Sequence, residues 1–279
     1  MPTIVYFSLP AHGHLNPSFP VVAELVQRGN HVHCFALERF RSGIEQSGAV
    51  FHEYSSRFDV PANGPGPFAR LDTTIDALIG LTRVVLEDDF GAVRRLHPDC
   101  ILHDAFGPWG RFVAQSLRLP AIVSLPSIAV NQQIAMGAGA PDLEFGRVIA
   151  DRMPHWRTSL AQLNRQFGVS AFSNPFELMH AYGDLNLVYT SRAFQPMAAA
   201  FDEDRFKFVG PSISDRAGVS RFPFQKLDGR PLLFVSLDSV YSDRGPFFEC
   251  CAQAFAANPW QVVMAVGQNM SGGVDQNLQ

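Results

Sequence analysis

Two residues of this sequence, His14 and Asp104, have the side-chain types and the positions that proton transfer requires. His14 lies in the stretch PAHGHLNP (residues 10–17), which follows an apolar run at residues 3–9 that is typical of a buried strand. Asp104 ends the run PDCILHD (residues 98–104), which has the same character. The carboxyl ends of parallel strands meet at one edge of a sheet, where open α/β sheets bind ligands, so we expect both side chains at that edge.

A histidine backed by a carboxylate can act as a general base. The imidazole titrates near neutral pH and can take a proton from a hydroxyl group. A buried carboxylate behind the ring fixes its tautomer and stabilises the imidazolium that forms. The spacing leaves a second interpretation open, in which His14 caps the helix that begins there and Asp104 caps the helix that follows its strand.

Two histidine pairs have the i, i+2 spacing of paired metal ligands, His12 with His14 and His31 with His33. Neither pair has a clear third ligand, which a zinc site would need. We interpret these residues as turn and surface histidines, and we expect no metal site.

The elements expected to position His14 and Asp104 alternate between strand and helix. Apolar residues at helical spacing follow His14, as on a helix with one buried face. The other segments expected to be strands are residues 31–37, 50–54, 121–124, 185–189 and 206–209, and those expected to be helical are 39–46, 68–96, 111–117 and 128–167. This order predicts an α/β fold with a Rossmann-like, doubly wound parallel sheet.

The periodic pattern stops at residues 212–231 and then begins again. We therefore expect a first domain at residues 1–211, a linker at 212–231 and a second domain at 232–279. The second domain shows one βαβ unit, with strands at 232–237 and 261–266 and a helix at 247–257. One such unit cannot bury both faces of its sheet, so we expect this domain to be incomplete.

The composition excludes several classes of protein. The 279 residues carry a formal net charge of −4, and Lys and Arg are scattered, which argues against a nucleic-acid partner. No apolar run approaches the roughly 20 residues that cross a bilayer, and no signal peptide is recognisable, so we expect a cytoplasmic protein without a membrane partner. The four cysteines form no CxxC pair and are expected to be reduced thiols.

Common phosphate-binding and nucleophile motifs are missing from the sequence. It contains no GxGxxG, no GxxxxGK[ST] and no GxSxG. Their absence argues against a nicotinamide dehydrogenase, a P-loop enzyme and an α/β hydrolase, and it disfavours other Rossmann-type nucleotide binders.

Three stretches of the chain resemble the macrolide-type glycosyltransferases, which belong to the UDP-sugar-dependent enzymes of the GT-B fold. They are FSLPAHGHLNPSFPVVAELVQRGNHV near the N-terminus, ILHDAFGPWGRFVA around Asp104, and GRPLLFVSLDSVYSDRGPFFECCAQAFAANPWQVVMAVG in the second domain. The resemblance implies two Rossmann-like domains, of which the first holds the acceptor and the second holds the sugar nucleotide.

The resemblance also implies an activity. His14 would deprotonate a hydroxyl of an apolar small molecule such as a macrolide or a phenol, with Asp104 as its carboxylate partner. The hydroxyl oxygen would attack the anomeric carbon of a UDP-sugar with inversion, and fixed donors would stabilise the leaving diphosphate. The UDP-sugar would be a co-substrate, and neither a metal nor a cofactor would be needed.

Further residues are candidates for the acceptor and donor sites. The residues expected to line the acceptor pocket are Phe106, Trp109, Met136, Phe145 and Trp156, although any one of them could instead pack in the core. The donor-side candidates are Gly13, Ser236 and Asp238, and Ser236 could equally cap a helix.

Two departures from the family pattern point to a rival interpretation. The histidine- and glycine-rich stretch that contacts the diphosphate in family members is not found in this chain. Asp238 stands where the family usually has glycine, and it adds negative charge near the expected phosphate. The rival is a truncated, non-catalytic acceptor-binding or partner protein of the same fold. The sequence leaves its oligomeric state open.

Overall fold

The computed structural model describes residues 1–60, 71–131, 134, 143–213, 222–237 and 245–266. The described residues up to 213 form one compact unit, and those from 222 onward belong to a second unit. Each unit is described by itself. In the described part of the chain, no helix is long and apolar enough to span a membrane.

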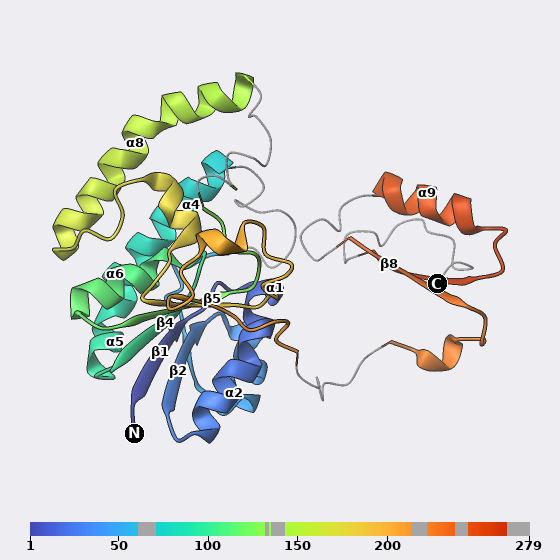
Figure 1. The fold of residues 1–279 in the computed structure, drawn as a ribbon, viewed down its shortest axis with the longest axis horizontal. Helices are drawn as coiled ribbons and strands as arrows, with labels where there is room; N and C mark the ends of the chain where they lie inside the picture. The colour runs from blue at the N-terminus through green and yellow to red at the C-terminus, as the bar shows by residue number, and fades with distance from the viewer. Residues whose placement is uncertain (61–70, 132–133, 135–142, 214–221, 238–244, 267–279) are drawn as a thin grey trace. The chain divides into compact units, whose positions relative to one another are not determined.

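The first unit is built on a parallel sheet of seven strands in the order β3-β2-β1-β4-β5-β6-β7 (Figure 1). The strands are β1 (Thr3–Phe7), β2 (His31–Ala36), β3 (Val50–Glu53), β4 (Cys100–Asp104), β5 (Ala121–Leu125), β6 (Leu185–Val188) and β7 (Phe206–Phe208). The α/β doubly wound sheet predicted from the sequence is confirmed. The strand order reverses direction between β1 and β4, which is where sheets of this kind bind ligands.

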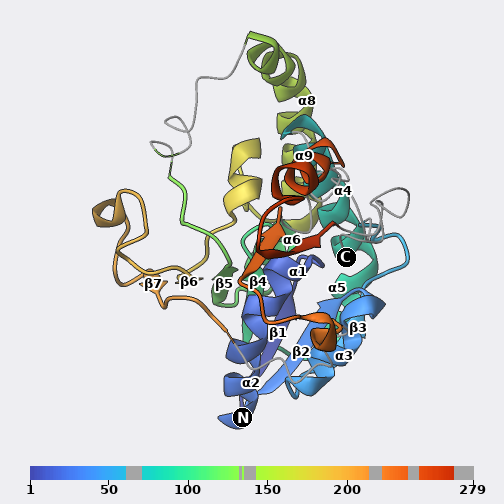
Figure 2. The same cartoon turned by 90° about the vertical axis from the view of Figure 1, so that its right-hand side faces the viewer.

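Helices connect the strands and cover the sheet (Figures 1 and 2). They are α1 (His12–Leu15), α2 (Phe19–Gln27), α3 (Arg41–Gln46), α4 (Leu71–Val84), α5 (Phe90–Arg95), α6 (Pro108–Leu117) and α8 (Leu143–Phe167). Short 3₁₀ turns lie at Asn16–Ser18, Glu38–Phe40, Pro175–His180 (η5) and Ala198–Ala200.

Side chains of β1 alternate between two cores, as the two-residue period of a strand requires. Val5 and Phe7 pack with buried residues of α4, α5, α6 and α8. Ile4 and Tyr6 pack on the opposite face with buried residues of α2 and α3. Because both faces are covered, nearly the whole strand is apolar, and this gave the sequence its strong strand signal.

The long helical region expected at residues 68–96 is interrupted. A π-helical turn occupies Val85–Asp89 between α4 and α5. The Asp89 carboxylate at the end of this turn accepts a hydrogen bond of 3.2 Å from the backbone N–H of Ser55. Burial raises the pKa of Asp89 to about 6. The π-helical turn is therefore bonded to the segment after β3. The two residues lie far apart in the sequence, so no local pattern predicts this contact.

The second unit contains a parallel pair of strands, β8 (Leu232–Ser236) and β9 (Gln261–Ala265), joined by α9 (Gly245–Phe255). Residues 222–231, expected in the linker, lie against this sheet. The Gln261 side chain donates to the Lys226 carbonyl at 2.9 Å and accepts from the Asp228 N–H at 3.0 Å.

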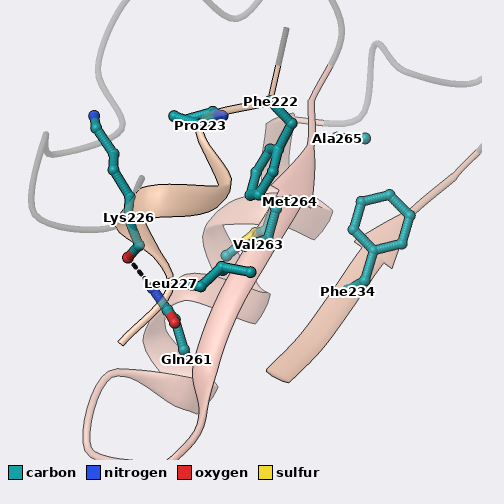
Figure 3. Close-up of a pocket in the computed structure, with 9 residues that line it drawn as sticks. All are labelled: Phe222, Pro223, Lys226, Leu227, Phe234, Gln261, Val263, Met264 and Ala265. Atoms are coloured by element: carbon teal, nitrogen blue, oxygen red, sulfur yellow. Dashed lines mark hydrogen bonds between the residues drawn. The ribbon is translucent and has the colours of Figure 1, made fainter. Parts of the chain in front are cut away.

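An apolar hollow lies between this 222–227 segment and the sheet (Figure 3). The rings of Phe222 and Phe234 and the side chains of Leu227 and Met264 line it. Phe234 remains 62% exposed, whereas parallel sheets are usually covered on both faces. The residues described in this unit therefore leave one face of its sheet largely open.

Candidate active site

His14 lies on the one-turn helix α1, directly after β1. The carbonyl of Ala11 accepts hydrogen bonds from the N–H groups of His14 and Leu15, at 3.0 and 2.9 Å. Leu15 is fully buried and anchors the turn in the core on the face of the sheet that α2 and α3 cover. The stretch that sequence analysis treats as a turn therefore contains one helical turn, which holds the His14 backbone in place.

The structure brings His14 and Asp104 together at the carboxyl edge of the sheet. His14 Nδ1 lies 3.0 Å from both carboxylate oxygens of Asp104. Asp104 is fully buried, whereas the His14 side chain keeps 24% of its surface exposed. The backbone N–H of Phe106 donates to Asp104 Oδ1 at 2.8 Å and helps to orient the carboxylate.

This geometry determines the chemistry that His14 can perform. The carboxylate accepts a hydrogen bond, so the proton of the neutral ring is held on Nδ1 and the basic lone pair lies on Nε2. The same carboxylate stabilises the imidazolium after Nε2 has taken a proton. The contact has the geometry that a histidine base and an orienting carboxylate use in known enzymes.

A buried hydrogen-bond chain holds the end of β1 that precedes α1. The Trp109 indole N–H donates to the Tyr54 hydroxyl at 3.1 Å, and this hydroxyl donates to the Ser8 carbonyl at 2.9 Å. Arg39 Nη2 donates to the Pro10 carbonyl at 2.8 Å. The segment that leads into His14 is therefore fixed by side chains from three other parts of the chain.

The residue before Asp104 is a fully buried histidine. His103 is fully buried in β4, and its Nδ1–H donates to the Asp104 carbonyl at 2.8 Å. Burial lowers the pKa of His103 to about 4. Gly110 of α6 is packed so closely on this residue that a Cβ at position 110 would overlap the His103 side chain.

We expect the neutral state of His103 to make the protein acid-sensitive. Below about pH 6.5 the unfolded chain takes up a proton at this position, but the folded chain does so only near pH 4. The free energy of unfolding should therefore fall by up to about 3 kcal/mol as the pH drops through this window. Urea denaturation at a series of pH values measures this fall.

His103→Asn is the variant that tests the assignment, because asparagine keeps a donor for the Asp104 carbonyl and does not titrate. We expect a shallower loss of stability between pH 6.5 and pH 4 in this variant. The exposed His155 offers the matched control, His155→Asn, which should follow the wild-type slope. An unchanged slope in His103→Asn would contradict the role given to His103.

No group of three or more His, Cys, Asp or Glu side chains is placed to hold a metal ion within the described part of the chain. His33 and His52 form a contact between Nδ1 and Nε2 of 2.9 Å across β2 and β3. Burial, and then neighbouring histidines, lower the pKa of both imidazoles. This pair therefore reads as two neutral rings that share one hydrogen bond.

Comparison with curated proteins identifies the family. The chain is 30% identical, over 279 residues, to the uncharacterized UDP-glucosyltransferase YojK of Bacillus subtilis (strain 168), and the match covers 97% of this chain and 67% of the relative. The chain belongs to the UDP-glycosyltransferase family. No family model matches it.

Other relatives of this glycosyltransferase chain are named for macrolide substrates. The demethyllactenocin mycarosyltransferase of Streptomyces fradiae is 32% identical over 98% of this chain and 60% of its own length. The oleandomycin glycosyltransferase of Streptomyces antibioticus is 27% identical over 96% of this chain and 62% of its own length. The chain thus spans about two thirds of the length of these curated relatives.

Solved glycosyltransferase structures share the fold. The calicheamicin glycosyltransferase CalG4 matches with a TM-score of 0.67 and 27% identity, over 99% of this chain and 69% of that structure. The glycosyltransferase of kitacinnamycin matches with a TM-score of 0.77 and 24% identity, over 100% of this chain and 69% of that structure. The family assignment and the observed sheet therefore agree.

The candidate acceptor residues divide into two groups. The half-buried ring of Phe106 lies edge-on to the His14 ring, with 5.5 Å between centroids. Trp109 and Trp156 are fully buried; Trp109 contacts Tyr54 and Phe58, and the Trp156 indole donates to Asp76 at 2.8 Å. This corrects the expectation for both tryptophans, because core packing leaves their side chains no surface for a ligand.

The other candidates are less defined. Met136 and Asp238 lie outside the described residues, and Phe145 is in α8 at a position where its side chain is not described. Gly13 is exposed on α1 beside His14, and a side chain there would meet open space. Ser236 is exposed at the end of β8 in the second unit.

Two further ring-bearing residues, His180 and Tyr182, lie near Phe106 and are missed by sequence analysis. Their segment precedes β6 and carries no motif. The N–H of Ala181 donates to the carbonyl of Ala105 at 3.0 Å and so joins this segment to the end of β4. A local pattern cannot reveal such a contact, because it depends on how α8 returns the chain to the sheet.

Proposed function

We propose that this chain carries the acceptor site and the general base of an inverting glycosyltransferase that uses a UDP-sugar. One observation carries the proposal: the partly exposed His14 ring lies with Nδ1 3.0 Å from both oxygens of the fully buried Asp104. The arrangement stands at the switch point of the sheet, where a ligand is expected. Family membership supports glycosyl transfer as the reaction.

In the proposed reaction, His14 Nε2 takes the proton of an acceptor hydroxyl. The hydroxyl oxygen forms a bond to the anomeric carbon of the sugar while the bond from that carbon to the diphosphate breaks. The bonding electron pair leaves with UDP, and attack from the opposite side inverts the anomeric centre. Asp104 holds the ring in the reactive tautomer and stabilises the resulting imidazolium.

The proposed substrates are a UDP-sugar and an apolar small molecule that carries a hydroxyl group. The macrolide names of two relatives and the half-buried Phe106 ring beside His14 support an apolar acceptor. We assign Gly13 and Ser236 to the donor side on the family resemblance alone. In the proposed reaction, no step uses a metal ion or a cofactor.

UDP release from the purified chain tests this function. We expect UDP to accumulate when UDP-glucose and 1-naphthol are both present, and to remain at background when 1-naphthol is omitted. Mass spectrometry should detect naphthyl glucoside in the complete mixture. Binding of 1-naphthol without UDP release and without glucoside would contradict the catalytic proposal.

A second candidate function is acceptor binding without turnover. It is favoured by Asp238, which stands where family members usually carry glycine and adds negative charge beside the expected diphosphate. Calorimetry distinguishes the two candidates, since a protein of this second kind would give heat with the acceptor and none with UDP. Restoring UDP binding by Asp238→Gly would identify the carboxylate as the cause.

A further inference from the structure

A row of rings continues from His14 along the carboxyl edge of the sheet. The Phe106 centroid lies 5.5 Å from that of His14, with the planes at 78°. The His180 centroid lies 6.2 Å from that of Phe106, and the Tyr182 centroid lies 6.0 Å from that of His180. Phe106, His180 and Tyr182 are all half-buried, so none of the three is enclosed completely by the core.

Hydrogen bonds hold this row in place. The N–H of Ala181 donates to the carbonyl of Ala105, the residue between Asp104 and Phe106. The Tyr182 hydroxyl accepts from the Val130 N–H at 2.7 Å and donates to the Val130 carbonyl at 2.9 Å. The 180–182 segment thus links the residues that follow β4 to those that follow β5. His180 comes directly before the two residues that make these hydrogen bonds, Ala181 and Tyr182.

We propose that His180 is a specificity-determining residue that, with Phe106 and Tyr182, selects acceptors whose hydroxyl is attached to a flat aromatic ring. The inference rests on the proposed function and narrows its substrate class. Aromatic rings attract one another in offset-stacked and edge-to-face arrangements at centroid distances of about 4.5–7 Å, a contribution beyond simple burial. Because the Phe106 ring adjoins the His14 ring, an aromatic ligand placed against Phe106 would lie beside the proposed base.

The chemistry of the base points to the same class of acceptor. A phenol has a pKa of about 10, as the tyrosine side chain does, whereas the hydroxyl of an aliphatic alcohol, like that of water, is a far weaker acid. A phenolic hydroxyl therefore gives its proton to an imidazole more readily than an aliphatic hydroxyl does. The ring row and the base favour the same substrate for independent reasons.

A matched pair of probes tests the inference by calorimetry with the full chain. 1-Naphthol and decahydro-1-naphthol share a carbon skeleton and a hydroxyl, but only the first is flat and aromatic. We expect the wild-type protein to bind 1-naphthol more tightly. His180→Leu, which keeps bulk without a ring, should weaken 1-naphthol binding about three- to tenfold and leave decahydro-1-naphthol unchanged.

Two variants control for folding and for the ring itself. His180→Phe should restore 1-naphthol binding, because it returns an aromatic face. His155→Leu, at an exposed position on α8, should bind both probes as the wild-type protein does. Circular dichroism checks that each variant is folded.

The inference is overturned if His180→Leu binds 1-naphthol as the wild-type protein does, if it loses both probes equally, or if the wild-type protein shows no preference for the flat ring. These outcomes are separate from a failure of the proposed function. A protein that prefers 1-naphthol through His180 but releases no UDP would retain the aromatic acceptor site and lose only the catalytic claim.

Discussion

Replacing His14 with alanine is expected to lower the rate of glycosyl transfer by between about 100-fold and 10,000-fold, the usual contribution of a positioned general base. The substitution removes the Nε2 lone pair and leaves the Asp104 carboxylate without its 3.0 Å partner. Acceptor affinity should change little, because the half-buried Phe106 ring and its neighbours remain. Initial rates of UDP release and calorimetric binding of the acceptor measure the two effects separately.

The neighbouring histidine supplies a matched control. His12 lies on the same turn of helix, is exposed, and has its ring against Phe40 with 4.9 Å between centroids. His12→Ala should retain transfer within a few-fold of the wild-type rate. Equal losses in the two variants would show that the turn itself is sensitive and would remove the distinction between the histidines.

Replacing Trp109 with alanine is expected to destabilise the first unit by about 3–5 kcal/mol, the typical cost of removing a large buried aromatic side chain. Trp109 is fully buried, packs edge-on against Phe58 with 5.2 Å between centroids, and donates to the hydroxyl of Tyr54. The variant therefore leaves a cavity, and it removes the indole N–H that donates to Tyr54 in the hydrogen-bond chain to Ser8. Urea denaturation followed by circular dichroism measures the loss.

Trp260 provides the control for this substitution, since it is 43% exposed. Trp260→Ala should change the free energy of unfolding of the first unit by less than about 0.5 kcal/mol, as is usual for surface positions. If Trp109→Ala left stability unchanged and weakened acceptor binding instead, Trp109 would belong to the acceptor site after all.

The sequence was sufficient to predict the sheet and the two residues of the proposed base. Buried parallel strands such as β1 and β4 are short apolar runs, so each is visible without knowledge of its neighbours. Topology then places the residues after β1 and at the end of β4 at one edge, which is where His14 and Asp104 lie. The strands are predicted from local hydrophobic patterns, and the placement of their ends follows from a general rule of sheet topology.

The sequence named Phe106 and Trp109 alike as acceptor candidates and missed His180, because burial and position here depend on contacts between distant segments. Phe106 and Trp109 are three positions apart and equally aromatic, yet one keeps exposed surface beside His14 and the other is enclosed by Tyr54 and Phe58. Only the packing of the β3–α4 connection on α6 distinguishes them. His180 likewise reaches the site through the bond from Ala181 to Ala105.

In the second unit, too, contacts between distant segments decide the structure. Residues 222–231 lack a hydrophobic period, which made them resemble a linker, but Gln261 bonds to two of their backbone groups. A segment held by backbone hydrogen bonds and by a few apolar side chains such as Phe222 and Leu227 gives no periodic signal. Its position depends on contacts with β9 that no local pattern shows.

In the proposed site, Asp104 holds His14 with its proton on Nδ1 and its basic lone pair on Nε2. Nitrogen chemical shifts of the His14 ring test this directly, measured on ¹⁵N-histidine-labelled protein above the pKa of that ring and assigned by comparison with His14→Ala. We predict that neutral His14 has a protonated Nδ1 and an unprotonated Nε2, and that Asp104→Asn shifts the ring toward the other tautomer. A wild-type ring protonated mainly on Nε2 would contradict the account, because that nitrogen could not then accept the acceptor's proton.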